Sequence, residues 1–474
     1  MARQRPYLFY DVAVTICPVC FKKLEGKVVF QDGKVLLLRR CPEHGAQDAL
    51  LADDVDYYRR CREVFIKAPE MPVRYNTPVR WGCPYDCGLC TDHEQHSCLT
   101  LVELGDHCNL ECPVCYAESG PSRPGFRSLA LIESMLDAVV ANEGSPDVVQ
   151  LSGGEPTLHP DFFKVLDLAK ARPIRHLMVN TNGLRIAQDE AFAERLASYL
   201  PGFELYLQFD SLEEAPLRAL RGADLRAVRA KALERLNRLG VSTTLVVTVS
   251  KGLNDGELGR IVDFALEQPC VRGVTFQPVQ AAGRLEGYDP VKDRLTLTEV
   301  RRRILEQTKV FRPEDILPVP CHPDSLAMAY ALKSGGKVTP LTGLIDPKLL
   351  IEGGRNTIIY EKDEAVKGAL FKLLATNHSP QSSALSLKDM LCCLPRVAAR
   401  DVGYKDVFRL IIMQFIDAWS FDVRSVKKSC VHIVHPDGRL IPFDTYNLFY
   451  RDGLEETRLA PLRRQAASAA GSVK

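Results

Sequence analysis

Three cysteines that follow a short apolar segment have the spacing of an iron–sulfur loop. Cys108, Cys112 and Cys115 form the pattern C-x3-C-x2-C, and Tyr116 comes directly after the third cysteine. Three thiolates on one loop can hold a single [4Fe–4S] cube, which contains four irons. One iron then has no protein ligand, and an open metal position is typical of a catalytic site. The spacing alone also fits a zinc knuckle or a structural cluster.

A glycine-rich motif, SGGEPT over residues 152–157, follows about one strand and one helix later. The adjacent glycines Gly153 and Gly154 let backbone groups approach a ligand closely. Glu155, which precedes Pro156, offers a carboxylate for an ammonium group. A Gly-Gly turn by itself is weak evidence, but its position after the cysteine loop makes the pair of motifs specific.

Together these two motifs resemble the radical S-adenosylmethionine (SAM) superfamily. The resemblance implies that Cys108, Cys112 and Cys115 hold the cluster and that its open iron chelates SAM. One electron then cleaves SAM to a 5′-deoxyadenosyl radical, so an electron donor such as ferredoxin or flavodoxin is needed. The GGEP motif is implied to hold the amino group of the methionine part of SAM.

Two more cysteine groups precede the loop, and the first reads CPVC…CPEH. Cys17, Cys20, Cys41 and His44 predict one metal ion, zinc or rubredoxin-like iron, that stabilises a small hairpin. Cys61 is the competing fourth ligand, but it lies in a polar helical segment. Such a closed site indicates a structural role rather than catalysis.

The second group reads GCPYDCGLC…HSC. Cys83, Cys87, Cys90 and Cys98 supply four thiolates, which would close a cube completely. We therefore expect an auxiliary [4Fe–4S] cluster there, and a zinc site on the same cysteines is the alternative. Sixteen cysteines in a chain of this composition indicate metal binding rather than a disulfide framework.

Strand and helix patterns alternate along the middle of the chain. The expected strands are 99–104, 148–151, 176–180, 204–209, 243–249 and 273–278, with helical segments between them. This alternation predicts an α/β fold with a parallel sheet and helices outside it. Six repeats match the partial (β/α)6, TIM-like barrel of the radical SAM superfamily. Chemistry is then expected at the carboxyl ends of the strands.

Polar residues end several of these strands. Asn180, Asp210 and Gln277 are the first candidates to contact the cofactor or the substrate. A capping or turn role is the competing interpretation for each of them.

The sequence suggests four segments. Residues 1–67 form the rubredoxin-like module, 68–98 the auxiliary cluster segment, 99–280 the barrel, and 281–474 an α+β domain for the substrate or an auxiliary cluster.

The C-terminal segment contains the remaining isolated cysteines. Cys321, Cys430 and one of Cys392 and Cys393 could converge on a third cluster, although isolated cysteines are more often buried apolar residues. Residues 406–419 predict an amphipathic or buried helix, and HIVHPDGRLIPF predicts a hairpin.

Bulk properties exclude several classes of protein. The chain has 474 residues, a hydrophobic content of 46% and a net charge of +1, so nothing indicates nucleic-acid binding. No apolar segment is long enough to cross a bilayer, and no signal peptide is evident. We expect a cytoplasmic protein, with peripheral membrane contact if the substrate is a lipid.

The order of the cysteine modules and the C-terminal HPDGRLIPFDTYN resemble the tetraether lipid synthase group and its bacterial relatives. Some of these relatives are labelled as methylating 7,8-dihydro-6-hydroxymethylpterin. The resemblance implies carbon–carbon bond formation on lipid chains, or methyl transfer to a pterin-like small molecule. Asp444 stands where the archaeal pattern has a cysteine. A non-catalytic zinc scaffold is the alternative from another class.

Overall fold

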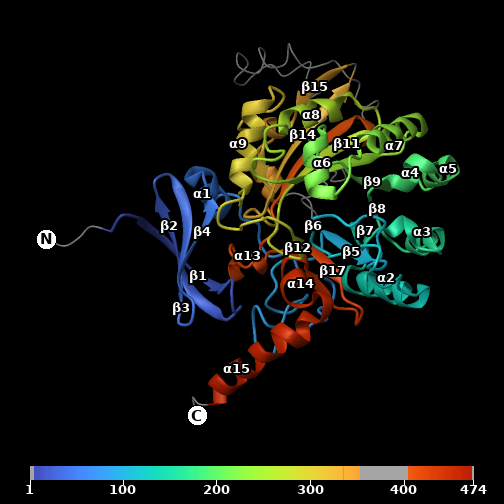
Figure 1. The fold of residues 1–474 in the computed structure, drawn as a ribbon. Helices are drawn as coiled ribbons and strands as arrows, with labels where there is room; N and C mark the ends of the chain where they lie inside the picture. Colours follow the sequence, from blue (N-terminus) through green and yellow to red (C-terminus); the bar gives the residue numbers. More distant parts are fainter. Residues whose placement is uncertain (1–4, 335, 353–403, 472–474) are drawn as a thin grey trace.

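The computed structural model describes residues 5–334, 336–352 and 404–471 (Figure 1). The strands are β1 Leu8–Ile16, β2 Lys23–Gln31, β3 Lys34–Cys41, β4 Gly45–Ala52, β5 Leu99–Glu103, β6 Val114–Cys115, β7 Val148–Ser152, β8 His176–Thr181, β9 Phe203–Gln208, β10 Thr243–Val249, β11 Val271–Pro278, β12 Arg284–Leu285, β13 Leu317–Pro318, β14 Leu326–Ser334, β15 Lys337–Pro340, β16 Val407–Met413, β17 Val431–Val434 and β18 Leu440–Pro442. The α-helices are α1 Val55–Glu63, α2 Leu129–Glu143, α3 Phe162–Lys170, α4 Leu184–Gln188, α5 Glu190–Ala197, α6 Glu214–Arg221, α7 Arg226–Leu239, α8 Leu258–Glu267, α9 Leu297–Gln307, α10 Pro347–Glu352, α13 Val423–Val426, α14 Phe443–Phe449 and α15 Ala460–Gly471.

The N-terminal module is a four-stranded antiparallel sheet in the order β1-β2-β3-β4, beside the barrel in Figure 1. The expected hairpin is its central pair, β2 and β3. Asp32 and Gly33 connect them with positive φ angles of 51° and 74°, as a tight hairpin turn requires. The sheet buries only a small apolar cluster that includes Val28, Val35 and Leu37. So small a core is consistent with a module that needs a metal ion for stability.

The expected parallel barrel is present. Strands β5, β7, β8, β9, β10 and β11 are consecutive neighbours in one sheet, and every pairing among them is parallel. Helices α2 to α8 lie along the outside of this curved sheet (Figure 1). Strand β10 reads TTLVVTV, a largely apolar run, because a parallel strand is covered on both faces.

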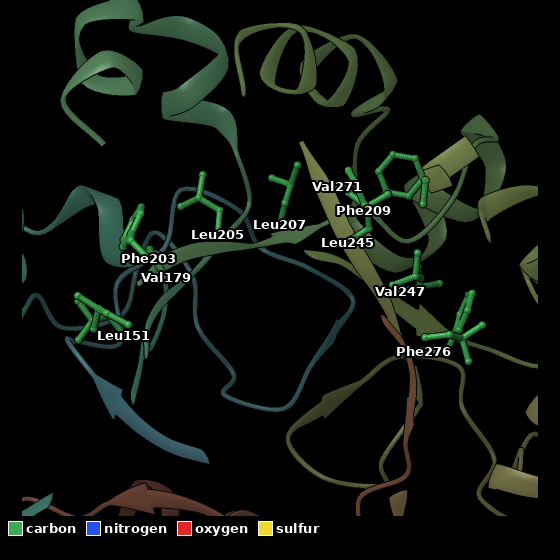
Figure 2. Close-up of a cluster of buried hydrophobic side chains, with 14 of the residues drawn as sticks. Leu151, Val179, Phe203, Leu205, Leu207, Phe209, Leu245, Val247, Val271 and Phe276 are labelled. Carbon is green, nitrogen blue, oxygen red and sulfur yellow. The ribbon is translucent and has the colours of Figure 1, made fainter. Parts of the chain in front are cut away.

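Alternate residues of each strand face the helices and the barrel interior. Leu205 and Leu207 of β9 belong to the apolar cluster under the helices, which Figure 2 shows together with side chains of β7, β8, β10 and β11. Tyr206, between them, belongs to a different cluster, and it lines a cavity together with Gln208. The strands thus present apolar residues outward and polar residues inward near their carboxyl ends.

The C-terminal segment departs from one expectation. Residues 406–419 do not form a helix, because β16 occupies Val407–Met413. The run VFRLIIM is apolar without a clear period, and such a run fits a buried strand as well as a buried helix. Strand β16 pairs in parallel with β11 and antiparallel with β14.

The expected hairpin at residues 431–442 is present as β17 and β18. Strand β17 pairs in parallel with β5, at the other end of the sheet from β13, β14 and β16. Residues after 281 therefore extend the barrel sheet at both of its ends. The boundary expected at residue 281 does not separate two sheets.

Candidate functional site

A cavity of about 160 Å³ lies at the carboxyl ends of the parallel strands. Its lining includes the cluster cysteines and most of the barrel residues predicted from the sequence: Cys108, Cys112, Cys115, Tyr116, Gly153, Gly154, Glu155, Asn180 and Gln277. Pro156 and Asp210 are not among the lining residues. The structure therefore brings the two sequence motifs to one place.

The cluster loop, residues 105–120, is held by backbone contacts on both sides. Cys108 N donates to Gly120 O over 3.2 Å, and β6 pairs with the short strand β12. Arg284 of β12 donates from Nε to Cys112 O over 2.6 Å. Arg284 belongs to no motif of the sequence, so its role in holding the loop was missed.

The Gly-Gly turn packs directly against the cluster loop. Gly154 N donates to Gly105 O over 2.8 Å, and Glu155 N donates to His107 O over 2.9 Å. A Cβ atom on Gly154 would lie 2.0 Å from His107 O. Only glycine permits this backbone approach, which fixes the turn beside the three cysteines.

The cluster cysteines have the surroundings that a metal cluster requires. Burial, with the nearby Glu155 carboxylate, raises the pKa of Cys108 to about 12. Burial also raises the pKa of Cys112, which Arg221 partly opposes. A bound metal would deprotonate these thiols. Because Cys108, Cys112 and Cys115 line one cavity, they fit an iron–sulfur cluster with three protein ligands.

Glu155 is fully engaged by the protein. Its Oε1 accepts from Thr157 N at 3.2 Å, Thr157 Oγ1 at 2.6 Å and Thr181 Oγ1 at 2.8 Å, and its Oε2 accepts from Asn182 N at 2.8 Å. A carboxylate offers about four acceptor positions. The side chain thus braces the end of β8 while it also lines the cavity, and its expected contact with an ammonium group stays a prediction.

Asp210 acts through an arginine rather than at the cavity wall. It has a positive φ of 66° and is fully buried. Arg221, the last residue of α6, donates to it from Nε at 2.7 Å and from Nη2 at 2.6 Å. Arg221 also donates to Thr248 Oγ1 at 2.7 Å and contacts the Cys112 thiol. Burial lowers the pKa of Arg221, but the carboxylate of Asp210 outweighs it, so the pKa is raised above its usual value. Sequence analysis missed Arg221, because a basic residue in the last helical turn usually indicates only a favourable dipole contact.

Three other predicted residues lie around the same cavity. Asn180 Nδ2 donates to Ser152 Oγ over 3.3 Å, and Gln277 Nε2 donates to Tyr206 Oη over 3.2 Å. The ring of Tyr116 lies 4.9 Å from that of Phe443, between centroids. Amide and hydroxyl groups therefore surround the space next to the cluster loop.

A buried ionic group occupies the barrel interior below these residues. Glu204 accepts from Arg409 Nη2 at 2.7 Å on both oxygens and lies 3.1 Å from His176 Nε2. Glu204 and His176 are at most 1% exposed, and Arg409 is 5% exposed. Although burial raises the pKa of Glu204, Arg409 and then His176 hold it well below its usual range. These residues close the floor of the barrel.

The N-terminal ligand set converges as the sequence suggested. The ribbon site, defined as Cys17, Cys20, Cys41 and His44, has all its ligand atoms within 4.8 Å of one another. Cys20 Sγ is 3.8 Å from Cys41 Sγ, and His44 Nδ1 is 3.4 Å from Cys41 Sγ. Cys61 is buried in α1 and is not in this group.

The auxiliary cysteines do not group as expected. Cys98 lies with Cys321 and Cys430, and these three sulfurs are within 4.8 Å of one another. Cys83, Cys87 and Cys90 remain on their own loop, so an auxiliary cluster there stays a prediction without Cys98 as its fourth ligand. Cys321 and Cys430 lie together as the sequence suggested, but spacing along the chain could not reveal that Cys98 joins them. Cys392 and Cys393 lie outside the described residues.

Asp444 is buried in α14 and engaged by hydrogen bonds. Its Oδ1 accepts from Ile416 N at 2.6 Å, and its Oδ2 accepts from Ser429 Oγ at 2.7 Å. Burial raises the pKa of Asp444 to about 6. Its protein partners therefore account for both carboxylate oxygens.

Comparisons with known proteins agree with this geometry. Residues 102–265 match the family model of the radical SAM superfamily, and residues 9–53 match the HMPTM N-terminal zinc ribbon domain. Residues 102–265 are thus a radical SAM domain, and the chain is an enzyme that uses a [4Fe–4S] cluster and SAM. No helix in the described part of the chain is long and apolar enough to span a membrane.

More specific similarity runs along almost the whole chain. It is 29% identical to the 7,8-dihydro-6-hydroxymethylpterin dimethyltransferase of Methanocaldococcus jannaschii over 498 residues, covering 95% of this chain and 96% of that protein. It is 29% identical to the GTP 3′,8-cyclase of Syntrophomonas wolfei, covering 57% of this chain and 83% of that protein. Streptococcus suis SuiB bound to S-adenosylmethionine aligns with a TM-score of 0.38 and 19% identity, over 44% of this chain and 46% of that one.

Proposed function

We propose that this enzyme methylates a small, polar heterocycle of the pterin type by a radical mechanism. The observation that carries the proposal is the end-to-end similarity to a pterin dimethyltransferase, which includes the N-terminal zinc ribbon. Carbon–carbon coupling of lipid chains, the leading expectation from the sequence, has no such support among these relatives.

The lining of the cavity combines polar groups with apolar side chains such as Leu101, Met413 and Phe415, a mixture that suits a flat polar ring. Amide side chains from four strands or their ends face the space beside the cluster loop: Gln150, Asn180, Gln208 and Gln277. Amide groups can donate and accept hydrogen bonds and so match the edge of a pterin ring. Asn180 and Gln277 each donate one hydrogen bond within the protein and keep further donor and acceptor positions for a ligand.

The barrel floor limits the length of the substrate. Tyr206 is only 8% exposed and lies above the buried group of Glu204, Arg409 and His176. These charges are already buried and paired with one another, and none of the three residues lines the cavity, so the cavity ends above them. A compact ring near the mouth of the barrel fits this interior better than a long chain along its axis.

A [4Fe–4S] cluster held by Cys108, Cys112 and Cys115, with SAM beside it, would supply one-electron radical chemistry. The chain's own residues position these groups. Gly153 and Gly154 bring the turn against the cluster loop, and Arg221 holds a positive charge beside Cys112. The amide groups orient the ring so that one carbon faces the radical, and exclusion of water protects that radical.

The test is product analysis under anaerobic, reducing conditions. We expect 6-hydroxymethyl-7,8-dihydropterin, incubated with the enzyme, SAM and a one-carbon donor, to gain the mass of a methylene group for each methyl group added. 5′-Deoxyadenosine should form at the same time. Cross-linked alkyl chains from a phospholipid substrate, with an unchanged pterin, would contradict the proposal.

A cavity variant sharpens this test. Gln277→Leu keeps the side-chain volume but removes the amide, so we expect KM for the pterin to rise about 10-fold, the effect of one lost hydrogen bond. The yield of deoxyadenosine in the absence of substrate should stay unchanged. An equal loss in both assays would mean that Gln277 supports the fold or SAM rather than the substrate.

A further inference from the structure

Two stacked aromatic side chains from the C-terminal segment line the cavity beside the cluster loop. Phe415 follows the end of β16 at Met413, and Phe443 is the first residue of α14. Their ring centroids are 3.8 Å apart, and the ring planes differ by 26°. Phe443 is 3% exposed, whereas Phe415 is half-buried, so Phe415 is the more accessible ring of the pair. We call Phe415 and Phe443 the aromatic wall.

The aromatic wall adjoins both the cluster loop and the amide-bearing end of β11. Strand β16 runs parallel to β11, so both strands end at the same edge of the sheet. Gln277 Nε2 of β11 lies 3.8 Å from Sδ of Met413, the last residue of β16. The ring of Phe443 lies 4.9 Å from that of Tyr116, between centroids, and Tyr116 directly follows the cluster cysteine Cys115. An apolar surface and hydrogen-bonding groups therefore meet in the same cavity.

Hydrogen bonds to both backbone groups of Ile416 hold the aromatic wall in place. Ile416 N donates to Asp444 Oδ1 over 2.6 Å, and Gln280 Nε2 donates to Ile416 O over 2.8 Å. Ile416 and Asp444 directly follow the two residues of the aromatic wall, so the first of these bonds joins the neighbours of the stacked rings. Asp444 itself is 1% exposed and is not among the residues that line the cavity. The protein therefore fixes the wall before a ligand binds.

We propose that the substrate ring stacks on Phe415 and that Asp444 positions the aromatic wall for this contact. The inference rests on the proposed function, because only a flat ring can use the face of a phenylalanine in this way. Stacking covers the apolar face of a heterocycle, while its polar edge stays free to meet amides such as Gln277. Phe415 then determines specificity, and Asp444 acts through Phe415 without touching the substrate.

Equilibrium dialysis tests the stacking contact on the full-length enzyme, reconstituted anaerobically and loaded with SAM, without reductant so that no turnover occurs. The probe is 6-hydroxymethyl-7,8-dihydropterin. Phe415→Leu keeps an apolar side chain but removes the ring, so we expect pterin affinity to fall about 10-fold, the effect of one lost stacking partner. Phe415→Tyr keeps the ring and should bind within about 3-fold of wild type. Phe264→Leu, from a stacked pair with Phe209 outside the cavity lining, is the control and should not change the affinity.

The outcomes separate this inference from the proposed function. A wild-type enzyme that does not bind the pterin would contradict both. Equal pterin affinity of wild type and Phe415→Leu, with methylated pterin still formed by the wild type, would overturn the stacking contact alone. A higher KM for SAM in Phe415→Leu at unchanged pterin affinity, measured by deoxyadenosine formation without pterin, would assign the aromatic wall to the nucleoside of SAM and overturn the stacking contact as well.

A double-mutant cycle tests the role of Asp444. Asp444→Leu removes the acceptor of Ile416 N, and we expect about a 10-fold loss of pterin affinity, equal to that of Phe415→Leu. The double variant should bind no more weakly than either single variant, because both changes remove the same contact. Asp444→Asn keeps an oxygen acceptor for Ile416 N and should bind like wild type, which can be measured even if Asp444→Leu does not fold. Losses that add in the double variant, or a pterin affinity of Asp444→Asn as low as that of Phe415→Leu, would overturn the positioning role.

Discussion

The ribbon site and the cluster loop both use closely spaced cysteines, but they differ in ligand number and spacing. The ribbon site has four ligand atoms within 4.8 Å of one another, at the edge of a small antiparallel sheet. The cluster loop supplies three cysteines that line a cavity and form no such close group among the described residues. Four close ligands enclose one ion, whereas three ligands around a cube leave an iron accessible to SAM.

The two regions also differ in how their backbone is supported. The ribbon site depends on its own hairpin and a small apolar cluster. The cluster loop is held from outside, by the Gly-Gly turn, by Arg284 of β12 and by Arg221 next to Cys112. A catalytic site with an open position therefore relies on the surrounding barrel for its rigidity.

The largest contrast between the regions should appear when one cysteine of each is removed. Cys112→Ala takes a ligand from a cluster that has only three, so we expect 5′-deoxyadenosine formation to be lost completely. Cys20→Ala should cost the chain its ribbon ion but leave SAM cleavage detectable. Chromatography of 5′-deoxyadenosine, with metal analysis of both proteins, checks this. Deoxyadenosine from Cys112→Ala would remove the basis of the comparison.

The next largest effect concerns the ion pair behind the cluster loop. Asp210→Asn leaves Arg221, 6% exposed, without its carboxylate, so the free energy of unfolding should fall by about 3–5 kcal/mol. Glu214→Gln, in the exposed ion pair with Arg218, should change the free energy of unfolding by less than about 1 kcal/mol. Urea denaturation of both variants gives the two values. Similar losses would mean that the buried pair does not support the loop.

Backbone contact at the Gly-Gly turn can be tested separately. A Cβ on Gly154 would collide with His107 O, so Gly154→Ala should displace the cluster loop and slow SAM cleavage about 100-fold, the cost of a small misplacement. Gly125→Ala is the control, because nothing lies within 4 Å of its added Cβ. Initial rates of deoxyadenosine formation measure both variants. A rate for Gly154→Ala equal to that of Gly125→Ala would refute the packing argument.

The smallest effect concerns the barrel floor and depends on pH. Thr244 Oγ1 donates to the ionised Glu204, so Thr244→Val should lower stability by about 1.5–3 kcal/mol at pH 7. The folded pKa of Glu204 lies below its unfolded value of about 4.3, so this stabilisation is present above that pH and is lost as the pH falls below it. The difference in the free energy of unfolding between Thr244→Val and wild type should therefore narrow below about pH 4.

Thr243→Val provides the neighbouring control for the pH experiment. Thr243 Oγ1 donates to the neutral Val241 O over 2.9 Å, so its loss should be nearly independent of pH. Urea denaturation at pH 7 and at about pH 3, below the unfolded pKa of Glu204, measures both variants. A loss for Thr244→Val at pH 7 no larger than the loss for Thr243→Val would show that Glu204 is not ionised in the folded protein.

Local periodicity made the barrel predictable. The alternation of strands and helices, the cluster loop and the SGGEP turn are all encoded within short segments, and the structure places them as expected. The ligand set of the ribbon site is also local, because a hairpin brings its two knuckles together. Each of these features depends on residues that lie close together in the chain.

Features that depend on distant segments could not be predicted. The sequence of β16 predicts a helix, but its pairing with β11 and β14 makes it a strand, and its own periodicity does not encode that pairing. Spacing in the sequence assigned Cys98 to Cys83, Cys87 and Cys90, whereas folding brings it to Cys321 and Cys430, which were expected to share a site without it. Arg221 carries no sequence signal, since only the tertiary fold places the end of α6 next to Cys112.

The most direct test of the account is whether SAM binds the open iron of the cluster held by Cys108, Cys112 and Cys115. Electron–nuclear double resonance on the reduced protein, with SAM labelled with ¹⁵N and ¹⁷O in its methionine part, measures this contact. We expect hyperfine coupling from the labelled amino nitrogen and carboxylate oxygen to the cluster. A reduced cluster whose signal shows no coupling to either label would contradict the assignment of an open iron.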